Sequence, residues 1–253
     1  MKQKIALITG ATAGIGFETA KILSENHFNI ILTGRRQDRL EKIRQELENE
    51  NCQVQTLCFD IRLKPDVDRA LASLSNDWKK VDILINNAGL AAGLDPVNQA
   101  NVDDWEAMID TNIKGLLYVT REVSNWMIAR QQGHILNISS IAGVQTYPNG
   151  SVYCATKHAV NAISKAMRVE LAPHNIKVGT ISPGAIETEF SLVRFKGDEE
   201  QAAKVYEGFT PLSARDIAES IYFVLSRPAH VNIDDLLIMP TAQASARDIF
   251  RKS

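Results

Sequence analysis

The chain has 253 residues and 45% hydrophobic content, so it can bury a full core, and one α/β domain over residues 1–253 is expected. Its 28 basic and 30 acidic residues give a net charge of -2 with no block of like charge, which argues against nucleic-acid and anionic-membrane partners and favours a small-molecule ligand. The N-terminal apolar run is too short for a signal peptide and no later run could span a bilayer, so a cytoplasmic location is expected.

The cysteines and histidines argue against a disulfide framework and against a metal site. Cys52, Cys58 and Cys154 are odd in number and lack a C-x-x-C spacing, and the five histidines are scattered along the chain. No cluster has the spacing of metal ligands, so no metal is expected.

The first predicted unit is a strand, a glycine-rich turn and a helix. Residues 4–10 form a continuous apolar run that ends in glycine, as expected for a strand buried on both faces of a parallel sheet. Three glycines in the turn permit a tight bend and let backbone N–H groups approach a pyrophosphate at the helix N-terminus, although an ordinary strand-to-helix turn could also use them. The candidate cofactor contacts in this turn are Gly10, Thr12, Ala13, Gly14, Ile15 and Gly16.

The second predicted strand, residues 28–34, is followed by Arg35 and Arg36. Dinucleotide-binding units that use NAD place an acidic residue here for the ribose 2′-hydroxyl, whereas arginine accommodates the 2′-phosphate of NADP. The arginine pair therefore favours NADP.

The remaining pattern continues the alternation of strands and helices. Two strand ends carry polar residues, at Asp60 and at the Asn86-Asn87-Ala88-Gly89 turn, where open α/β sheets bind ligands. A loop of about twenty residues, 189–210, with a short helical stretch near 199–206, has the length typical of a lid. The other predicted elements are strands at 52–60, 81–89, 134–140, 177–184 and 236–240, and helices at 37–50, 64–78, 102–131, 214–226 and from Ser151 to Pro173.

Tyr153 and Lys157 are candidates for acid/base chemistry. They are four residues apart, so in a helix they lie on one face, one turn from each other. A nearby ammonium favours the phenolate, so Lys157 is expected to bring the pKa of Tyr153 into a useful range. Ser140, at the end of a predicted strand, offers a hydroxyl that could hydrogen-bond a substrate oxygen.

The alternation predicts a Rossmann-type doubly wound parallel sheet with helices on both faces. Together the Gly10 to Gly16 turn, Asp60, the 86–89 turn, Asn112, Ser140, Tyr153-x-x-x-Lys157 and Pro183-Gly184 with Thr188 resemble the short-chain dehydrogenase/reductase superfamily. The resemblance implies a catalytic tetrad of Asn112, Ser140, Tyr153 and Lys157, in which Asn112 anchors a water of the proton relay. It also implies cofactor contacts from Asp60, Ile61, Asn87, Ala88, Gly89, Tyr153, Lys157, Pro183, Gly184, Ile186 and Thr188.

Within the superfamily, the sequence is similar to the NADP-dependent 3-hydroxy acid dehydrogenases, also called serine 3-dehydrogenases. The segments that carry this similarity are residues 33–40, 87–90, 110–116, 188–198, 228–233 and 238–243. Ala13 departs from many NADP-preferring relatives, in which a basic residue precedes the second glycine, so the 2′-phosphate preference rests on Arg35 and Arg36.

Three functions compete on the sequence alone. The first is hydride transfer between NADP and C3 of small 3-hydroxy acids such as serine, 3-hydroxypropionate and 3-hydroxyisobutyrate. The second is reduction of a 3-oxoacyl thioester on acyl carrier protein, but the sequence shows no basic cluster to dock that acidic partner. The third is a non-catalytic NADP sensor; such proteins commonly lose the tyrosine or the lysine, and both are present here.

Two further expectations concern the substrate and the assembly. A carboxylate entering a partly dry pocket needs a paired cation, and Arg194 is the first candidate beside Ser140 and Tyr153 for substrate binding, with Lys196 second and a solvated loop arginine as the alternative. The helix at 102–131 and the Tyr153 helix carry more apolar positions than one sheet face requires, which predicts a homotetramer.

Overall fold

The computed structural model describes residues 3–252 and confirms the predicted doubly wound sheet. Seven strands, all paired in parallel, follow the order β3-β2-β1-β4-β5-β6-β9. They are β1 (Ile5–Ile8), β2 (Asn29–Gly34), β3 (Val54–Cys58), β4 (Ile83–Asn86), β5 (Gly133–Ile138), β6 (Ile176–Pro183) and β9 (Asp235–Ile238). The strand order reverses between β1 and β4, and this reversal opens a crevice at their carboxyl ends.

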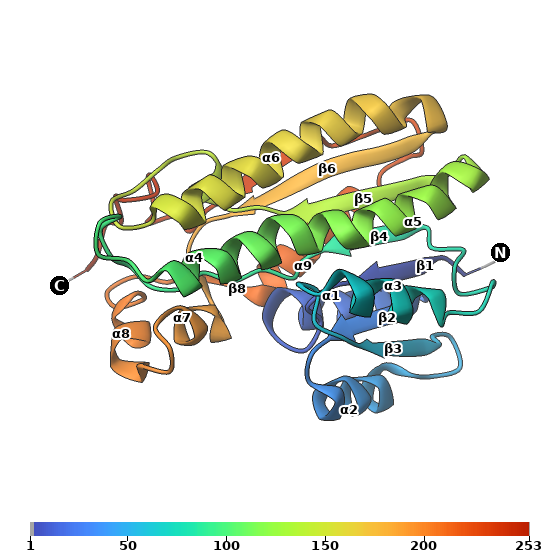
Figure 1. The fold of residues 1–253 in the computed structure, drawn as a ribbon, viewed down its shortest axis with the longest axis horizontal. Coiled ribbons are helices and arrows are strands. Elements are labelled where there is room, and N and C mark those ends of the chain that lie inside the picture. The colour runs from blue at the N-terminus through green and yellow to red at the C-terminus, as the bar shows by residue number, and fades with distance from the viewer. Residues whose placement is uncertain (1–2, 253) are drawn as a thin grey trace.

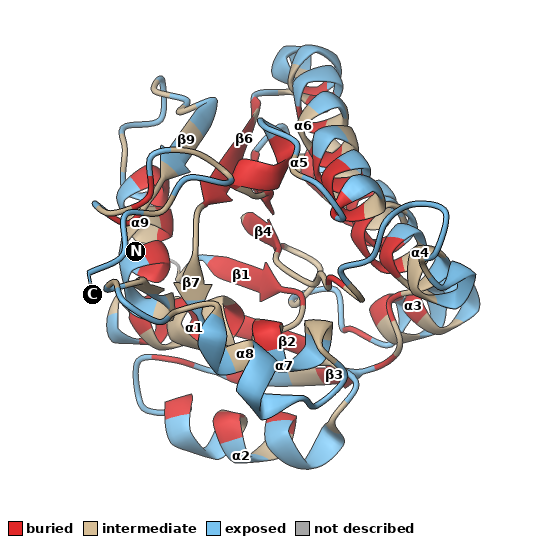
Figure 2. Ribbon diagram, turned by 90° about the vertical axis from the view of Figure 1, so that its left-hand side faces the viewer, coloured by how far each residue is buried: buried red, intermediate tan, exposed pale blue. Residues whose placement is uncertain are grey.

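Helices cover both faces of the sheet, and the buried residues gather in the strands and on the helix sides that face them (Figures 1 and 2). One face is covered by α1 (Gly14–Glu25), α2 (Gln37–Leu47) and α9 (Ala214–Leu225), and the other by α3 (Lys64–Ala72), α5 (Leu116–Arg130) and α6 (Ser151–Leu171). None of the helices within residues 3–252 has the length and apolarity that a membrane crossing requires.

The central strand β1 is apolar throughout because each of its side chains meets a helix layer. In β1, Ile5 and Leu7 pack into the cluster with α3, α5 and α6, while Ala6 and Ile8 pack into the cluster with α1, α2 and α9. Since alternate residues of a strand point to opposite faces, a strand covered on both sides buries every side chain and favours apolar residues at each position. The strand ends are thereby held firmly, and the polar residues that follow them have fixed positions.

The long predicted helix is present, with a distortion in its middle. The helix α4 (Val102–Ile109) continues through a π-helical segment, Asp110–Gly115, into α5 without a break. A Cβ on Gly115 would lie 3.0 Å from two side-chain carbons of Ile61, so the glycine lets this segment pass close to the end of β3. Such π-bulges occur frequently at functional sites, and this one carries Asn112.

Residues 189–210, here called the lid segment, contain two short helices where the sequence predicted one. The unpredicted helix is α7 (Glu189–Arg194), and the predicted stretch is α8 (Glu199–Lys204). Thr188 caps α7 by accepting a hydrogen bond from Phe190 N at 3.2 Å. Six residues are too few to show helical periodicity, which is why the sequence pattern missed α7. Two short strands at its ends, β7 (Ile186–Glu187) and β8 (Leu212–Ser213), pair with each other and were also missed.

Two further predictions from the sequence concern the end of helix α3, which lies earlier than predicted, and the pairing of helices between subunits, which is not tested. The helix α3 ends at Ala72 rather than at residue 78, because Ser73 caps it and donates its hydroxyl to Ala70 O. Leu117 on α5 and Val169 on α6 are exposed, and the pairing of these helices between subunits stays a prediction.

His134 in β5 makes stability depend on pH. Burial, with Lys177 and Lys4 nearby, lowers its pKa from 6.5 to about 3, and its Nε2 has no partner among the described residues. The unfolded chain therefore takes up this proton below pH 6.5 while the folded chain does not, so stability is lost as pH falls from 6.5 towards 3.

The contribution of His134 should reach about 2 kcal/mol at roughly pH 5. The free energy of unfolding would be measured with urea at neutral pH and at roughly pH 5. Its decrease between the two pH values should be smaller in His134→Leu than in the wild type by that amount. An identical loss in both proteins would show that other groups carry the acid sensitivity.

Candidate active site

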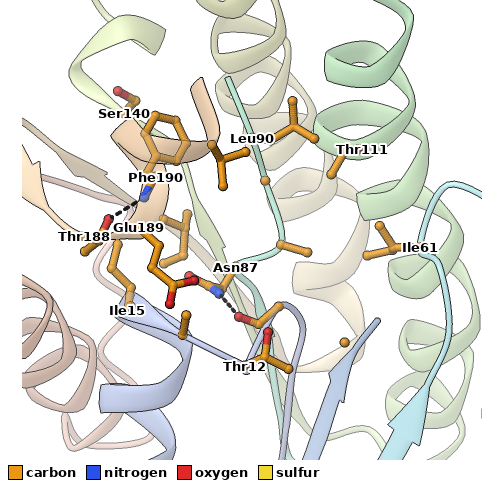
Figure 3. A pocket seen from close by; sticks show the side chains of 18 of the residues that line it. Thr12, Ile15, Ile61, Asn87, Leu90, Thr111, Ser140, Thr188, Glu189 and Phe190 are labelled. Atoms are coloured by element: carbon orange, nitrogen blue, oxygen red, sulfur yellow. Dashed lines mark hydrogen bonds between the residues drawn. The ribbon is translucent and has the colours of Figure 1, made fainter. Parts of the chain in front are cut away.

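A cavity of about 380 Å³ opens at the crevice between β1 and β4. Figure 3 shows side chains from the ends of several strands and from the start of the lid segment converging on it. It is lined by most of the residues predicted to contact a cofactor, namely Gly10, Thr12, Ala13, Gly14, Ile15, Arg35, Arg36, Asp60, Ile61, Asn87, Ala88, Gly89, Tyr153, Lys157, Pro183, Gly184, Ile186 and Thr188. Ser140 lines it too, whereas Gly16, Asn112 and Arg194 do not.

The glycine-rich turn has the geometry that a pyrophosphate requires. Gly10 has φ +65° and no room for a side chain, since a Cβ there would lie 2.9 Å from Ala88 Cα. Gly16 lies behind the turn, where a Cβ would meet Gly10 O at 2.6 Å, so the glycine lets the start of α1 pack against the turn itself. The turn leads directly into the N-terminus of α1, whose free N–H groups and dipole favour an anion.

Cationic side chains gather at the end of the cavity beside β2 and α2. Arg36 donates to Thr12 Oγ1 through Nη2 at 2.7 Å and to Glu189 at 3.2 Å. Arg39, one helical turn further on, donates to Glu189 at 2.8 Å. Arg35 is exposed and lies 4.0 Å from Asp60. A dinucleotide with its pyrophosphate on the glycine turn and a 2′-phosphate at these arginines fits the residues present.

The opposite end of the cavity holds Ser140, Tyr153 and Lys157. Lys157 Nζ lies 5.9 Å from the centre of the Tyr153 ring and donates to Ile138 O at 2.9 Å, which ties the ammonium to the end of β5. Ser140 Oγ accepts from Ala142 N at 3.1 Å and also hydrogen-bonds the Tyr153 phenol. The predicted hydroxyl, phenol and ammonium are therefore brought together.

Burial is the largest cause of the pKa shifts of Tyr153 and Lys157. Burial raises the pKa of Tyr153 above its ordinary value, the neighbouring Tyr147 adds to the rise, and the groups that oppose it are Ser140, through its hydrogen bond, and the positive charge of Arg194. The effect of Lys157 on this pKa stays a prediction; its ammonium lies 5.9 Å from the centre of the Tyr153 ring. Burial lowers the pKa of Lys157 itself to about 8. Arg194 is thus a further positive charge near the Tyr153 phenol, with its guanidinium carbon 5.8 Å from the centre of the ring.

Asn112 is buried behind the cavity and holds the chain after β4 in place. Its side chain accepts from Leu90 N at 2.9 Å and donates to Leu90 O at 2.9 Å and to Thr156 Oγ1 at 3.0 Å. These bonds connect the π-helical segment to the wall of the cavity and to α6. They give Asn112 a positioning role, and the water of the proton relay stays a prediction.

Arg194 lies against the catalytic end of the cavity. Its guanidinium carbon is 5.8 Å from the centre of the Tyr153 ring and 5.6 Å from that of Tyr147, and Nε donates to Gly93 O at 3.3 Å. Its Nη2 is buried and has no hydrogen-bond partner within residues 3–252. Arg194 and Tyr153 also line an adjoining hollow of about 20 Å³. Arg194 is therefore not the solvated loop arginine that the sequence left open as the alternative.

Several residues at this site were not identified from the sequence. Lys196, the second candidate, is paired with Asp104 at 2.9 Å and is not free to bind a substrate. Phe190 packs against Tyr153 with ring centres 5.8 Å apart, and Glu189, its neighbour in α7, also lines the cavity. Tyr147 approaches from another segment and contacts Arg194. Phe190 and Glu189 reach the cavity through the folding of the lid segment, whereas Arg39, also not identified from the sequence, lies in the first turn of α2.

Comparisons with known proteins agree with this geometry. The chain matches the family model for short chain dehydrogenases over residues 4–198. It is 47% identical over 243 residues to the NADP-dependent 3-hydroxy acid dehydrogenase YdfG of Salmonella typhi, covering 96% of this chain and 97% of that protein. A probable NADP-dependent dehydrogenase of Haemophilus influenzae is 47% identical over 247 residues, with 97% of each chain covered. The solved closed form of serine dehydrogenase complexed with NADP+ matches with a TM-score of 0.91 and 45% identity over 96% of this chain and 97% of that one.

Proposed function

Because the chain belongs to the short-chain dehydrogenase family, we propose that it transfers hydride between NADP and C3 of small 3-hydroxy acids. It is an NADP-dependent oxidoreductase that acts on a CH–OH group. The relatives named for 3-hydroxy acids and for serine cover nearly all of this chain and support that substrate class.

The proposed chemistry requires one hydride and one proton to leave the alcohol. Bound NADP supplies the hydride acceptor. Tyr153, ionised in the reactive form, takes the hydroxyl proton as the C3–O bond becomes a carbonyl, and it returns the proton in the reverse direction. Ser140 donates to the same oxygen and holds it beside the phenol. Lys157 fixes the nicotinamide ribose, as in the family.

The observation that carries the substrate proposal is the position of Arg194. The Arg194 guanidinium interacts with Tyr147 but keeps one buried atom, Nη2, without a direct hydrogen bond within residues 3–252, and this supports a ligand group that pairs with it beside Tyr153. A carboxylate is the matched partner, because its two oxygens accept the parallel N–H bonds of arginine. A substrate that reaches both Arg194 and Tyr153 must carry its carboxylate close to the carbinol carbon, as small 3-hydroxy acids do.

A substrate panel tests the proposal. NADPH formation, followed by absorbance, should be fastest with serine, 3-hydroxypropionate or 3-hydroxyisobutyrate, and the corresponding uncharged alcohols should react poorly. Reduction of an acetoacetyl thioester should be much slower than oxidation of these acids. Preference for the thioester would favour the acyl carrier protein reaction, and a protein that binds NADP but turns over none of these compounds would favour the sensor.

A further inference from the structure

Glu189 places a carboxylate inside the cofactor cavity. It is the first residue of α7, and Figure 3 shows its side chain extending from the start of the lid segment towards Thr12 and Asn87. Its oxygens accept from Arg39 Nη1 at 2.8 and 3.1 Å and from Arg36 Nη1 at 3.2 Å. The lid segment is thereby connected to α2 across the mouth of the cavity.

Arg36 lines the cationic end of the cofactor cavity, and Arg39, which is not among the lining residues, reaches this end through its bond to Glu189. Arg36 immediately precedes α2 and Arg39 lies in its first turn, so both guanidinium groups stand at the end of β2, where the adenosine ribose of a dinucleotide lies. The hydrogen bond from Arg39 and then that from Arg36 lower the pKa of Glu189, so the carboxylate stays ionised at neutral pH. The Glu189 carboxylate therefore occupies the position beside Arg36 and Arg39 where an anionic group of a ligand would bind.

We propose that Glu189 is an internal competitor for the 2′-phosphate of NADP, and that cofactor binding exchanges the carboxylate for the phosphate at Arg36 and Arg39. The exchange releases the start of the lid segment from α2, so the lid segment responds to the 2′-phosphate itself. Arg39 becomes a further determinant of cofactor specificity. The proposal concerns the adenosine end of the cofactor and holds whichever alcohol is the substrate.

The strengths of the two interactions make the exchange feasible. Glu189, Arg36 and Arg39 have exposed side-chain fractions of 47%, 41% and 43%, and ion pairs this exposed contribute little stability. A phosphate carries more charge and three strong acceptor oxygens, so it binds the same arginine pair more strongly. A pyrophosphate on the glycine turn also repels the carboxylate, because Thr188, the residue before Glu189, lies 3.5 Å from the Cβ position of Gly14.

Calorimetric binding of two cofactor fragments tests the exchange without any substrate. Adenosine 2′,5′-bisphosphate carries the 2′-phosphate, whereas 5′-AMP lacks it. Glu189→Gln should bind the bisphosphate about fivefold more tightly than the wild type, the upper end of the effect of removing one exposed competing ion pair, and should change 5′-AMP binding by less than about twofold. Glu187→Gln, an exposed carboxylate two residues earlier, is the matched control and should leave both affinities unchanged.

A second variant tests the role of Arg39. In the Glu189→Gln background, Arg39→Gln should weaken bisphosphate binding about tenfold and leave 5′-AMP binding unchanged. The proposal is overturned if Glu189→Gln does not tighten bisphosphate binding, if it tightens both fragments equally, or if Arg39→Gln has no effect in that background. A wild-type protein with no preference for the bisphosphate would overturn it as well.

Discussion

Replacing Tyr153 with phenylalanine should lower kcat at least about a hundredfold while leaving the dissociation constant of NADP nearly unchanged. The side chain is only 8% exposed, and phenylalanine keeps the ring contacts with Phe190 and Arg194 while removing the one group that transfers the proton. The measurement is NADPH formation at saturating substrate, with cofactor affinity determined separately by fluorescence or calorimetry.

Tyr147→Phe is the matched control, because Tyr147 contacts the same guanidinium but does not line the cavity. It should retain most of the turnover. If Tyr153→Phe retained more than about a tenth of the wild-type kcat with unchanged NADP affinity, Tyr153 would not be the proton-transfer group.

Replacing Arg194 with leucine should raise KM for serine or 3-hydroxypropionate at least about tenfold, yet barely affect an uncharged alcohol of similar size. The physical reason is the buried, unpartnered Nη2 beside Tyr153, which would lose a carboxylate partner but contributes nothing to a neutral substrate. Since Arg194 also opposes the raised pKa of Tyr153, the pH at which turnover rises should shift upward in the variant.

Lys196→Met removes a positive charge two residues away that pairs with Asp104 outside the cavity. It should leave the ratio of acid to alcohol activity unchanged. Equal rises in KM for charged and uncharged substrates in Arg194→Leu would show that the arginine only holds the lid segment in place, and an unchanged KM for both would exclude it as the carboxylate partner.

The parts of the site that lie on the sheet could be predicted from the sequence because they follow local rules. Continuous apolar runs mark buried parallel strands, glycines mark the turn at Gly10, and a four-residue spacing places Tyr153 and Lys157 on one helix face. Each of these patterns is complete within one or two elements, and the structure contains all of them.

The rest depends on packing between distant segments. The helix α7 has only six residues and is defined by the Thr188 cap and its contacts, so it could not be predicted from hydrophobic periodicity. The approach of Arg194 to Tyr153, and of Glu189 to Arg39, joins residues far apart in the chain. The pKa of Tyr153 is set first by burial, a property of the folded interior that spacing along a helix does not reveal.

Isotope transfer is the most direct test of hydride exchange between NADP and C3 of a 3-hydroxy acid. The protein would be incubated with NADP+ and 3-hydroxypropionate that carries deuterium at C3, and the NADPH analysed by mass spectrometry and NMR. Deuterium at C4 of the nicotinamide is the expected result, with a reduced yield in Arg194→Leu at low substrate concentration. NADPH free of deuterium, or no NADPH from this acid and from serine labelled in the same way, would contradict the proposed reaction.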